Sequence, residues 1–333
     1  MAADSSKSGA PFRVIAASEY PQVLARHIKN AKKSIILAAL VLRTGSAMAQ
    51  ILDAVMAAAR RGVMVDIIAD PYGLHDASRP EHVPIGTFKE ECRRTLEFCS
   101  DIQRLGGAVH WTKPLGVIPY KGRFHAKAAI VDDHVFSFGG INLDDSSFDN
   151  IDYMLYTQSA HIAAVLTKVL LHSDPLHNST QKLDAKNTLL FDAGIPGESI
   201  IYSQACHLAE QARSVQYLSL MCPTGRLAEI LKQKKADCYF VPPWHLGVTM
   251  ADVAQQWDNW VTHVPNLYEG TQKIHAKCML FDMPDGAKVA LTGSHNFSWR
   301  GVAFGTQELA LQSADPNLWQ RLQDVIYAVA TRD

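Results

Sequence analysis

The sequence predicts an α/β protein built from two similar halves, each a layered α/β/α sheet. The 333-residue chain is 47% apolar and 20% charged, an ordinary balance for a globular protein with a sizeable core. Short runs rich in Ile, Leu and Val alternate with helical patterns, and the same order of elements returns later in the chain. We divide the chain into a flexible N-terminal tail of residues 1–11, a first half of residues 12–180 and a second half of residues 181–333.

The first half opens with a strand–helix–strand–helix–strand series, which is typical of parallel strands joined by helices. Ile51, Val55 and Ala58 recur at helical spacing, and Gly62 follows as a helix stop signal. A loop rich in Pro, Gly and His follows the third strand. The predicted elements are strands at Phe12–Ala17, Ser34–Leu42, Val63–Ala69 and Ala108–Thr112, helices at Glu19–Lys32, Ser46–Arg61, Phe88–Leu105 and His161–Leu171, and the loop Asp70–Thr87.

The second half repeats this order after a polar seam near Asp174–Lys186. The segments Lys33–Leu37 and Arg213–Tyr217 align, since each opens a strand that follows an amphipathic helix and precedes a second helix and strand. The elements predicted here are strands at Ser199–Ser203, Val215–Met221 and Ala236–Val241, and helices at Gln204–Arg213 and Arg226–Lys234.

Composition excludes several classes of protein. The formal charge of −1 lacks the basic excess of a dedicated nucleic-acid binder. The longest apolar run, Ile35–Leu42, is far too short to span a bilayer, and Met1–Pro11 has no signal-peptide core. The six cysteines form no CxxC pair, which indicates free thiols in a reducing compartment. We therefore expect a cytoplasmic protein, with peripheral membrane contact left open.

The strongest signal is a pair of matching segments. The first contains His125, Lys127 and Asp132, followed by Gly139-Gly140-Ile141-Asn142. The second contains His275, Lys277 and Asp282, followed by Gly293-Ser294-His295-Asn296. Both have the form HxKxxxxD followed by G-[GS]-x-N, and an acidic residue comes soon after each, Asp152 and Glu308.

The spacing of these motifs predicts their local structure. Alternate residues of a strand face one side, so His and Lys should project together from each copy. The turns after Asp132 and Asp282 should form hairpins, and the glycines of the returning strand should let the backbone approach a ligand. A metal centre is not expected, because an ammonium beside the histidine repels a cation and no HxxxH, HExxH or Cys cluster is present. We therefore expect no cofactor.

These residues resemble the phospholipase D superfamily, whose members carry two HxKxxxxD motifs with a following G-S-x-N. The resemblance runs from about Phe12 to the C-terminal helix. Gly140 stands where the family has Ser, and ten residues separate Asp282 from Gly293 against six between Asp132 and Gly139. Neither departure removes a His, Lys or Asn, so the resemblance implies a retained activity.

The resemblance implies double displacement through a covalent phosphohistidine. It suggests His125 as the nucleophile and His275 as the acid and base, with the reverse assignment left open. The lysines and asparagines would stabilise the phosphoryl charge, Asp152 and Glu308 would orient the histidines, and Gly140 and Ser294 would line the phosphate pocket. Asp132 and Asp282 are motif residues for which a structural role is an equal alternative. We expect the halves to be related by a pseudo-twofold axis with the active site at their interface.

The family includes phospholipases, phosphatidyltransferases, nucleases and inactive members. The run Gly140–Ser147 partly matches the N-L-D-x-R-S continuation of the cardiolipin synthase branch, with Asp145-Ser146 in place of x-Arg. Aromatic residues in Tyr239–Leu246, together with Trp257 and Trp260, could rim an acyl cleft or could be ordinary core. We expect a monomer acting on phospholipid, with water or an alcohol as acceptor. A nuclease or other non-lipid phosphodiesterase is the alternative, and a scaffold that binds anionic headgroups is a third.

Overall fold

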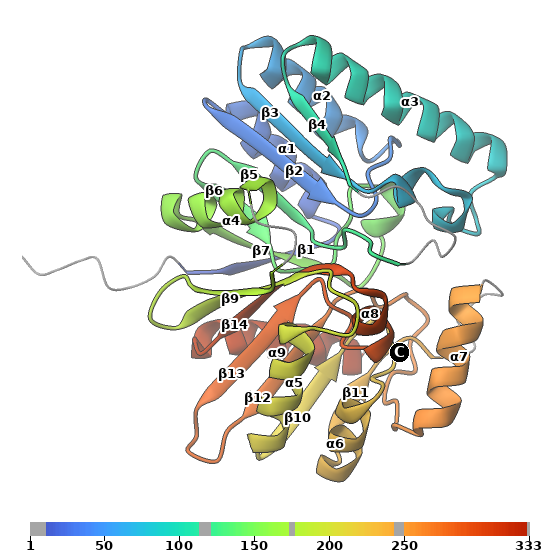
Figure 1. Cartoon of the computed structure of the whole chain (residues 1–333), viewed down its shortest axis with the longest axis vertical. Coiled ribbons are helices and arrows are strands. Elements are labelled where there is room, and N and C mark those ends of the chain that lie inside the picture. The colour runs from blue at the N-terminus through green and yellow to red at the C-terminus, as the bar shows by residue number, and fades with distance from the viewer. Residues whose placement is uncertain (1–10, 113–120, 173–176, 243–249, 332–333) are drawn as a thin grey trace, which may run out of the picture. The chain divides into compact units, whose positions relative to one another are not determined.

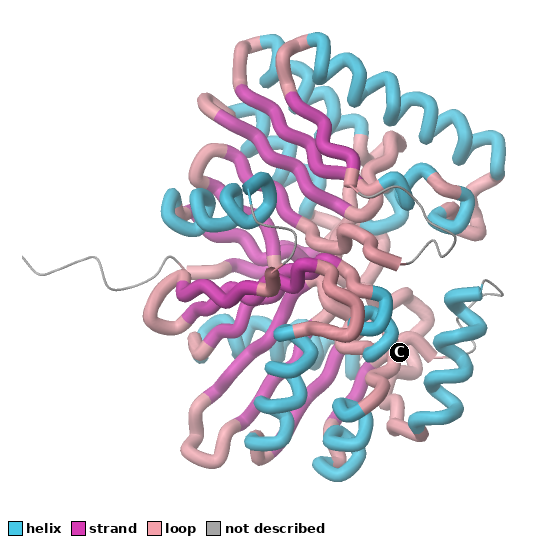
Figure 2. The backbone as a smooth tube through the Cα atoms, in the orientation of Figure 1, coloured by secondary structure: helices cyan, strands magenta, loops and turns pink. Residues whose placement is uncertain are grey.

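The computed structural model describes residues 11–112, 121–172, 177–242 and 250–331. The chain divides into two compact units, one of residues 15–174 and one of residues 175–333 together with 1–14. Each contains a seven-stranded mixed sheet with helices, which confirms the α/β class and the two similar halves (Figures 1 and 2). Residues 1–10 of the predicted tail, the start of the polar seam at 174–176 and residues 243–246 of the aromatic stretch lie outside the described residues.

The first sheet has the strand order β1-β7-β6-β5-β2-β3-β4. Strands β2, β3 and β4 are parallel, as predicted, whereas the pairs β2–β5, β5–β6 and β6–β7 are antiparallel. The predicted series needs one correction, because its first strand lies at the far edge beside β7 and not next to β2. The elements are β1 (Arg13–Ala16), α1 (Tyr20–Asn30), β2 (Ser34–Ala39), α2 (Ala49–Arg60), β3 (Met64–Ala69), α3 (Ile85–Arg104), β4 (Ala108–Trp111), β5 (Ala128–Val131), β6 (His134–Ser137), β7 (Tyr153–Gln158) and α4 (Ala160–His172), with short 3₁₀ turns at Pro71–Leu74, Asp76–Ser78 and Asp145–Ser147.

The second sheet has the order β8-β9-β14-β13-β12-β10-β11. Six of its strands match six of the first sheet in position and sequence order. Within the described ranges, β4 has no counterpart in the second sheet and β8 none in the first. The elements are β8 (Ser179–Lys182), β9 (Asn187–Ala193), α5 (Ile200–Gln211), β10 (Ser214–Leu218), α6 (Arg226–Lys234), β11 (Asp237–Tyr239), α7 (Met250–Thr262), β12 (Cys278–Asp282), β13 (Lys288–Gly293), α8 (Trp299–Phe304), β14 (Gln307–Ser313) and α9 (Pro316–Ala330).

One stretch of the second half was wrongly predicted. Ser199–Ser203 is not a strand but the start of α5, and the strands that precede it are β8 and β9. Ile200 and Ile201 favour strands locally, but the Ser199 hydroxyl accepts the Tyr202 N–H at 2.9 Å and caps a helix. The polar residues of the seam concealed β8, which is a sheet edge with alternating exposure.

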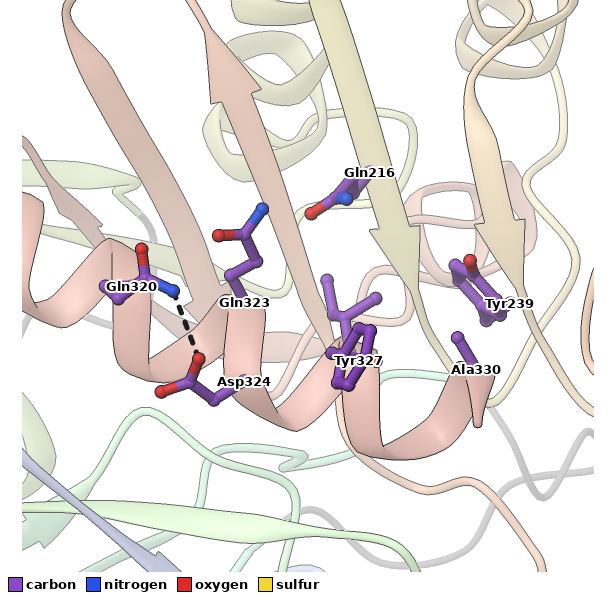
Figure 3. A pocket seen from close by; sticks show the side chains of 8 residues that line it. Gln216, Tyr239, Gln320, Gln323, Asp324, Tyr327 and Ala330 are labelled. Atoms are coloured by element: carbon purple, nitrogen blue, oxygen red, sulfur yellow. Dashed lines mark hydrogen bonds between the residues drawn. The ribbon is translucent and has the colours of Figure 1, made fainter. Parts of the chain in front are cut away.

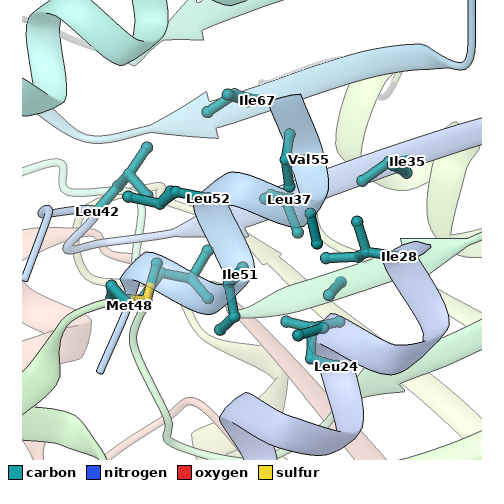
Figure 4. Packing of buried hydrophobic residues seen from close by; sticks show 14 of the residues in the cluster. Leu24, Ile28, Ile35, Leu37, Leu42, Met48, Ile51, Leu52, Val55 and Ile67 are labelled. Carbon is teal, nitrogen blue, oxygen red and sulfur yellow. The ribbon is translucent and has the colours of Figure 1, made fainter. Parts of the chain in front are cut away.

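Each sheet has helices on both faces. Alternate residues of β2, such as Ile35 and Leu37, join one cluster with α1 and α2 (Figure 4), and α4 contacts β6 outside that cluster. Each fully buried Leu or Ile in this cluster contributes about 1.5–3 kcal/mol. In the second unit α5 and α6 cover one face, while α9 packs on β12 and β13. None of the described helices is both long and apolar enough to cross a membrane.

The aligned segments Lys33–Leu37 and Arg213–Tyr217 have the same place in their sheets. Ile35 pairs with Val131 in the first sheet, and Val215 pairs with Phe281 in the second. Val131 and Phe281 each stand six residues after the motif histidine. The internal repeat therefore extends to the register of the strand that carries each motif.

Candidate active site

The two motif segments follow the same local path. A bridge residue, Phe124 or Ile274, comes first, then three residues outside regular strand, then β5 or β12. His and Lys therefore lie just before the strands and not within them, which corrects the predicted placement. His275 is 9% exposed and His125 more so, whereas Lys127 and Lys277 are 1% and 0% exposed.

Each buried lysine is held in the same way. Its ammonium donates a hydrogen bond to the carbonyl of the motif histidine two residues earlier, at 2.7 Å from Lys127 and 2.5 Å from Lys277. A buried ammonium is costly unless it is hydrogen-bonded or balanced by negative charge. Two lysines fixed in this way at matching sheet ends give each unit a positioned cation.

The glycine that opens each G-[GS]-x-N segment is required by the neighbouring strand. A Cβ on Gly139 would lie 1.8 Å from the carbonyl oxygen of Tyr153, and one on Gly293 would lie 2.1 Å from that of Leu309. Real atoms cannot approach so closely. The expectation that these glycines admit a ligand is therefore corrected, because adjacent backbone occupies the space.

The same contacts establish which acidic residues correspond. Because Tyr153 and Leu309 take equivalent places, Asp152 corresponds to Glu308, and both are buried. The Glu308 carboxylate accepts the hydroxyl of Ser294. The Asp152 carboxylate accepts the backbone N–H of Gly140 at 3.1 Å and that of Tyr153 at 2.8 Å. A backbone donor in the first copy thus replaces the missing serine hydroxyl.

The two asparagines have different surroundings. The Asn142 side-chain carbonyl accepts the Val41 N–H at 3.4 Å. The backbone carbonyl of Asn296 accepts the Ser219 hydroxyl at 3.1 Å, while its side-chain oxygen is buried without a hydrogen-bond partner among the described residues. An orphaned buried oxygen is uncommon in folded proteins.

Asp132 and Asp282 hold the strands together. Asp132 accepts the N–H groups of Lys32, Lys33 and Ser34 at 2.8–3.0 Å. Burial acts to raise the pKa of Asp132, but these hydrogen bonds outweigh it and hold the pKa below its usual value. Asp282 pairs with Arg213 and Lys288, and these contacts also lower its pKa. Both residues connect the motif strand to its neighbours, and the predicted hairpin turns follow them.

Two buried acids at these sheet ends were absent from the sequence-based set. Asp70, after β3, accepts the Phe124 N–H at 2.8 Å, the Arg123 guanidinium at 2.8 Å and the Thr112 hydroxyl at 2.7 Å. It therefore fixes the residues that lead into His125. Its position at the carboxyl end of a parallel strand was the available signal. The second acid, Asp192, is the cross-strand neighbour of Glu308 in the β9–β14 ladder.

Other features lie apart from the motifs. A cavity of about 370 Å³ lies between α9 and the β10–β11 edge, and no motif residue lines it (Figure 3). The side chains around it include Gln216, Tyr239, Gln323 and Tyr327. No group of three or more His, Cys, Asp or Glu suited to a metal is found in the described part of the chain. All six cysteines are free thiols.

A family model described as "Cardiolipin synthase, PLD-like domain" matches residues 24–172. Phosphatidylserine synthase from Haemophilus influenzae Rd KW20 has a similar structure, with a TM-score of 0.68, 15% identity, and coverage of 96% of this chain and 86% of that one. Polyphosphate kinase from Porphyromonas gingivalis has a TM-score of 0.61 and 14% identity over 97% of this chain, which spans only 51% of that kinase. No curated protein sequence matches the chain.

The family match covers the first copy of the motif, and the structural likeness extends over both halves. The second copy repeats the first in sheet order, register, lysine contact and acidic residue. Residues 24–172 therefore resemble a cardiolipin synthase-type PLD-like domain, and the chain shares its fold with the phosphatidylserine synthase.

Proposed function

We propose that this protein is an enzyme that acts on phospholipids, cleaving or exchanging the headgroup ester through a covalent phosphohistidine. The observation that carries the proposal is the pair of buried lysines, each fixed by the carbonyl of its motif histidine. A phosphodiester in reaction carries negative charge on its non-bridging oxygens. Ammonium groups held in place before the reaction stabilise that charge without reorganisation.

The first step forms one bond and breaks another. The neutral His125 imidazole attacks phosphorus, an N–P bond forms, and the P–O bond to the leaving alcohol breaks. His275 donates its proton to the departing oxygen, so the alcohol leaves neutral. The His125 imidazole must reach the phosphorus, and the His275 imidazole must reach the leaving oxygen bonded to the same phosphorus. The mechanism therefore requires both histidines to serve one site.

The second step reverses this chemistry with a new acceptor. Water or an alcohol gives a proton to His275, its oxygen bonds to phosphorus, and the N–P bond to His125 breaks. Water yields hydrolysis, and an alcohol yields phosphatidyl transfer. Both histidines return to their starting protonation states, and the overall reaction needs no metal or redox partner.

The remaining site residues support these two. Asn142 and Asn296 supply amide donors to the phosphoryl oxygens, and Asp152 and Glu308 hold the imidazoles in the reactive tautomer. Gly140 and Ser294 act through these carboxylates, because each donates a hydrogen bond to one of them. Asp132 and Asp282 maintain the strands that carry the lysines.

An exposed aromatic helix beside the second motif favours a lipid substrate. On α7, Val253, Trp257 and Trp260 are 53%, 60% and 66% exposed at helical spacing. The helix is attached to α8 through an ion pair between Asp258 and Arg300, with a shortest distance of 2.6 Å. Indole rings favour the boundary between apolar and aqueous phases. Because α8 begins three residues after Asn296, the ion pair attaches the aromatic face of α7 to the segment that carries this motif asparagine.

One assay separates lipid from nucleic-acid substrates. Purified protein is incubated with mixed phospholipid vesicles, with single-stranded DNA and with double-stranded DNA, and the products are resolved by mass. We expect a released headgroup alcohol, and a new phospholipid when an acceptor alcohol is present. Cleavage of DNA with intact lipid would instead support the nuclease alternative.

Trapping the intermediate identifies the nucleophile. In His275→Asn, a nitrophenyl phosphodiester needs no protonation of its leaving group, so an adduct should accumulate on His125. His125→Asn should form no adduct with any substrate. Each change should lower turnover of the natural ester by about 10² to 10⁴-fold. Phosphate on His275 in the His125→Asn protein would reverse the assignment, and no adduct in either variant would favour direct attack by water.

A chelator tests the metal-free mechanism. Activity should persist in EDTA, because lysines take the charge-stabilising role that a metal has in other phosphodiesterases. Complete loss of activity, restored by a divalent ion, would contradict the proposal.

A further inference from the structure

A second buried carboxylate stands behind the second motif. Asp192 in β9 is the cross-strand partner of Glu308 in β14. Their exposed fractions are 2% and 3%. Two carboxylates this close and this buried cannot both ionise at ordinary cost. The charge on one therefore depends on the charge of the other.

The groups around Asp192 partly stabilise its ionised form. The Ser199 hydroxyl donates to Asp192 at 2.5 Å, and the Ile200 N–H at the start of α5 donates at 2.8 Å. Of the elements packed against it, β14 presents the Glu308 carboxylate and α5 presents these uncharged donors. The nearest residues of β8, Ser179 and Thr180, are also uncharged. Glu308 is thus the charged group that faces Asp192 among the described residues.

The edge strand beside the first motif differs from β9. The carbonyl of Asp152 accepts the Ala17 N–H at 2.9 Å, next to the edge strand β1. That strand, Arg13–Ala16, contains no Asp or Glu. Among the described strands that lie next to β7 and β14, β9 is therefore the one that carries a carboxylate.

We infer that Asp192 is a positioning residue that acts through Glu308 to favour the protonated form of His275, and so makes His275 the acid of the pair. The inference rests on the proposed function, in which Glu308 holds His275. A negative charge behind Glu308 stabilises the imidazolium, while the described strands next to β7 offer His125 no such charge, so His125 stays the neutral nucleophile. The asymmetry supplies a physical reason for the division of roles.

Asp192 changes its charge near neutral pH. Burial raises its pKa to about 7; the repulsion of Glu308 adds to this, and the bonds from Ser199 and Ile200 oppose it. As pH rises past neutrality Asp192 becomes charged, and it then helps His275 to retain its proton. The general acid should therefore remain active to higher pH than an isolated imidazole would.

The test compares pH profiles of kcat/KM for the wild type and Asp192→Asn. Asn can still accept the Ile200 N–H and can donate to Ser199, so the fold should be kept. We expect the alkaline limb for a phospholipid ester to move down by about 0.5 pH unit, with the plateau rate changed less than about threefold. A nitrophenyl diester, which needs no acid, should show no shift in this limb.

A matched control is Asp315→Asn. Asp315 also caps a helix, accepting the Asn317 N–H at the start of α9, but it is not paired with Glu308. Its pH profile should superimpose on that of the wild type. Superimposable profiles for Asp192→Asn, an equal shift with the nitrophenyl diester, or a loss above tenfold at all pH values would each overturn the inference.

A second measurement does not depend on activity. The pKa of each motif imidazole is measured by NMR titration of ¹⁵N-histidine-labelled protein. In Asp192→Asn the His275 pKa should fall by about 0.5 unit while the His125 pKa stays unchanged. An unchanged His275 pKa would refute the inference, whereas a wild type inert toward every phosphodiester would refute only the proposed function. If Asp192→Asn fails to fold, Ser199→Ala, which removes a donor to the charged form, should lower the His275 pKa in the same direction, and no change would overturn the inference.

Discussion

The two motif copies reach the same backbone geometry with different side chains. In the first copy, the segment before His125 is held by Asp70 through the Arg123 guanidinium and the Phe124 N–H. In the second, Asn266 accepts the N–H groups of Phe240 and Tyr268, both at 3.1 Å, and donates to the Phe240 carbonyl. The first half thus has a charged anchor beside its motif, whereas the second has a neutral amide that joins Tyr268 to the end of β11. What the copies share is the placement of His and Lys, not the means of holding them.

The returning strands differ in a second respect. Ala128 pairs with Ser137, so Phe138 is an extra residue before Gly139, and it has a φ of +56°. In the second copy Cys278 pairs with Thr292, which is followed directly by Gly293. The Ser137 hydroxyl donates to the Lys127 carbonyl at 3.0 Å, the place that the Gly293 N–H takes beside Lys277 at 3.2 Å. A bulge is thus tolerated because a hydroxyl replaces the displaced backbone donor.

The largest difference between the copies should appear when their anchors are removed. Asp70→Ala removes the carboxylate that pairs with the buried Arg123 guanidinium and should lower the free energy of unfolding by about 3–5 kcal/mol. Asn266→Ala removes only neutral hydrogen bonds and should cost about 1–3 kcal/mol. Urea unfolding followed by tryptophan fluorescence and far-UV circular dichroism measures both.

A carboxylate in the same half serves as the control for the anchor. Asp66 lies on β3 and contacts the exposed His110 at 3.1 Å, so Asp66→Ala should change stability by less than about 1 kcal/mol. Equal effects of Asp70→Ala and Asn266→Ala would show that the charge on the first anchor is irrelevant to its strength.

Substitution of the first glycine of the G-[GS]-x-N segment should have a similar effect in both copies, because the neighbouring strand excludes a side chain in each. Gly139→Ala and Gly293→Ala each place a methyl group against neighbouring strand backbone, which should cost about 1–3 kcal/mol or more. Gly86→Ala is the control, since nothing lies within 4 Å of its added Cβ and it stands near the start of α3. That change should be neutral or stabilise by up to about 1 kcal/mol. Thermal unfolding of the three variants measures these effects. An unchanged stability of Gly293→Ala would contradict the predicted clash with the Leu309 carbonyl.

Local structure was easier to predict than contacts between distant parts of the sequence. The hairpins and the aligned strands followed from spacing, because they are local patterns, whereas His and Lys lie just before the strands in which they were expected. The requirement for Gly139 depends on Tyr153 in another strand, and no local pattern indicates that contact. Asp70 and Asp192 were missed for the same reason, since Asp70 bonds Phe124 across 54 residues of sequence. Ser199 was misassigned because its neighbours favour strands and only its hydroxyl bond identifies a cap.

A smaller difference concerns the serine found in the second copy alone. Ser294→Ala removes the hydroxyl that donates to the buried Glu308 carboxylate and should cost about 1.5–3 kcal/mol, the range for a hydrogen bond to a charged group. Ser203→Ala is the control, because that hydroxyl donates to a neutral carbonyl on a half-buried part of α5 and its loss should cost under about 1 kcal/mol. Chemical unfolding of both variants compares them. Equal losses would show that Glu308 has no special need of Ser294.

The smallest expected effect contrasts the pH dependence of the two halves. In the first half, His27 on α1 lies beside His134 with ring centroids 4.3 Å apart. Burial lowers the pKa of His27, and His134 and Arg26 lower it further. A histidine with a lowered folded pKa takes up its proton more readily when unfolded. Stability should therefore decrease as pH falls below about 6.5, the usual value for histidine, toward the lower folded value.

The raised pKa of Asp192 gives the second half the opposite sign, because its stabilising contribution is lost as pH rises toward 7. The His27 effect should amount to only a few tenths of a kcal/mol, since a half-exposed ring keeps much of its hydration. Hydrogen exchange read by mass spectrometry at pH 5.5 and 7.5, corrected for the intrinsic rate, resolves peptides of α1 and β6 from those of β9 and β14. His27→Gln should remove the slope in the first set and leave the second unchanged. A slope that survives His27→Gln would assign the pH dependence of this half to another group.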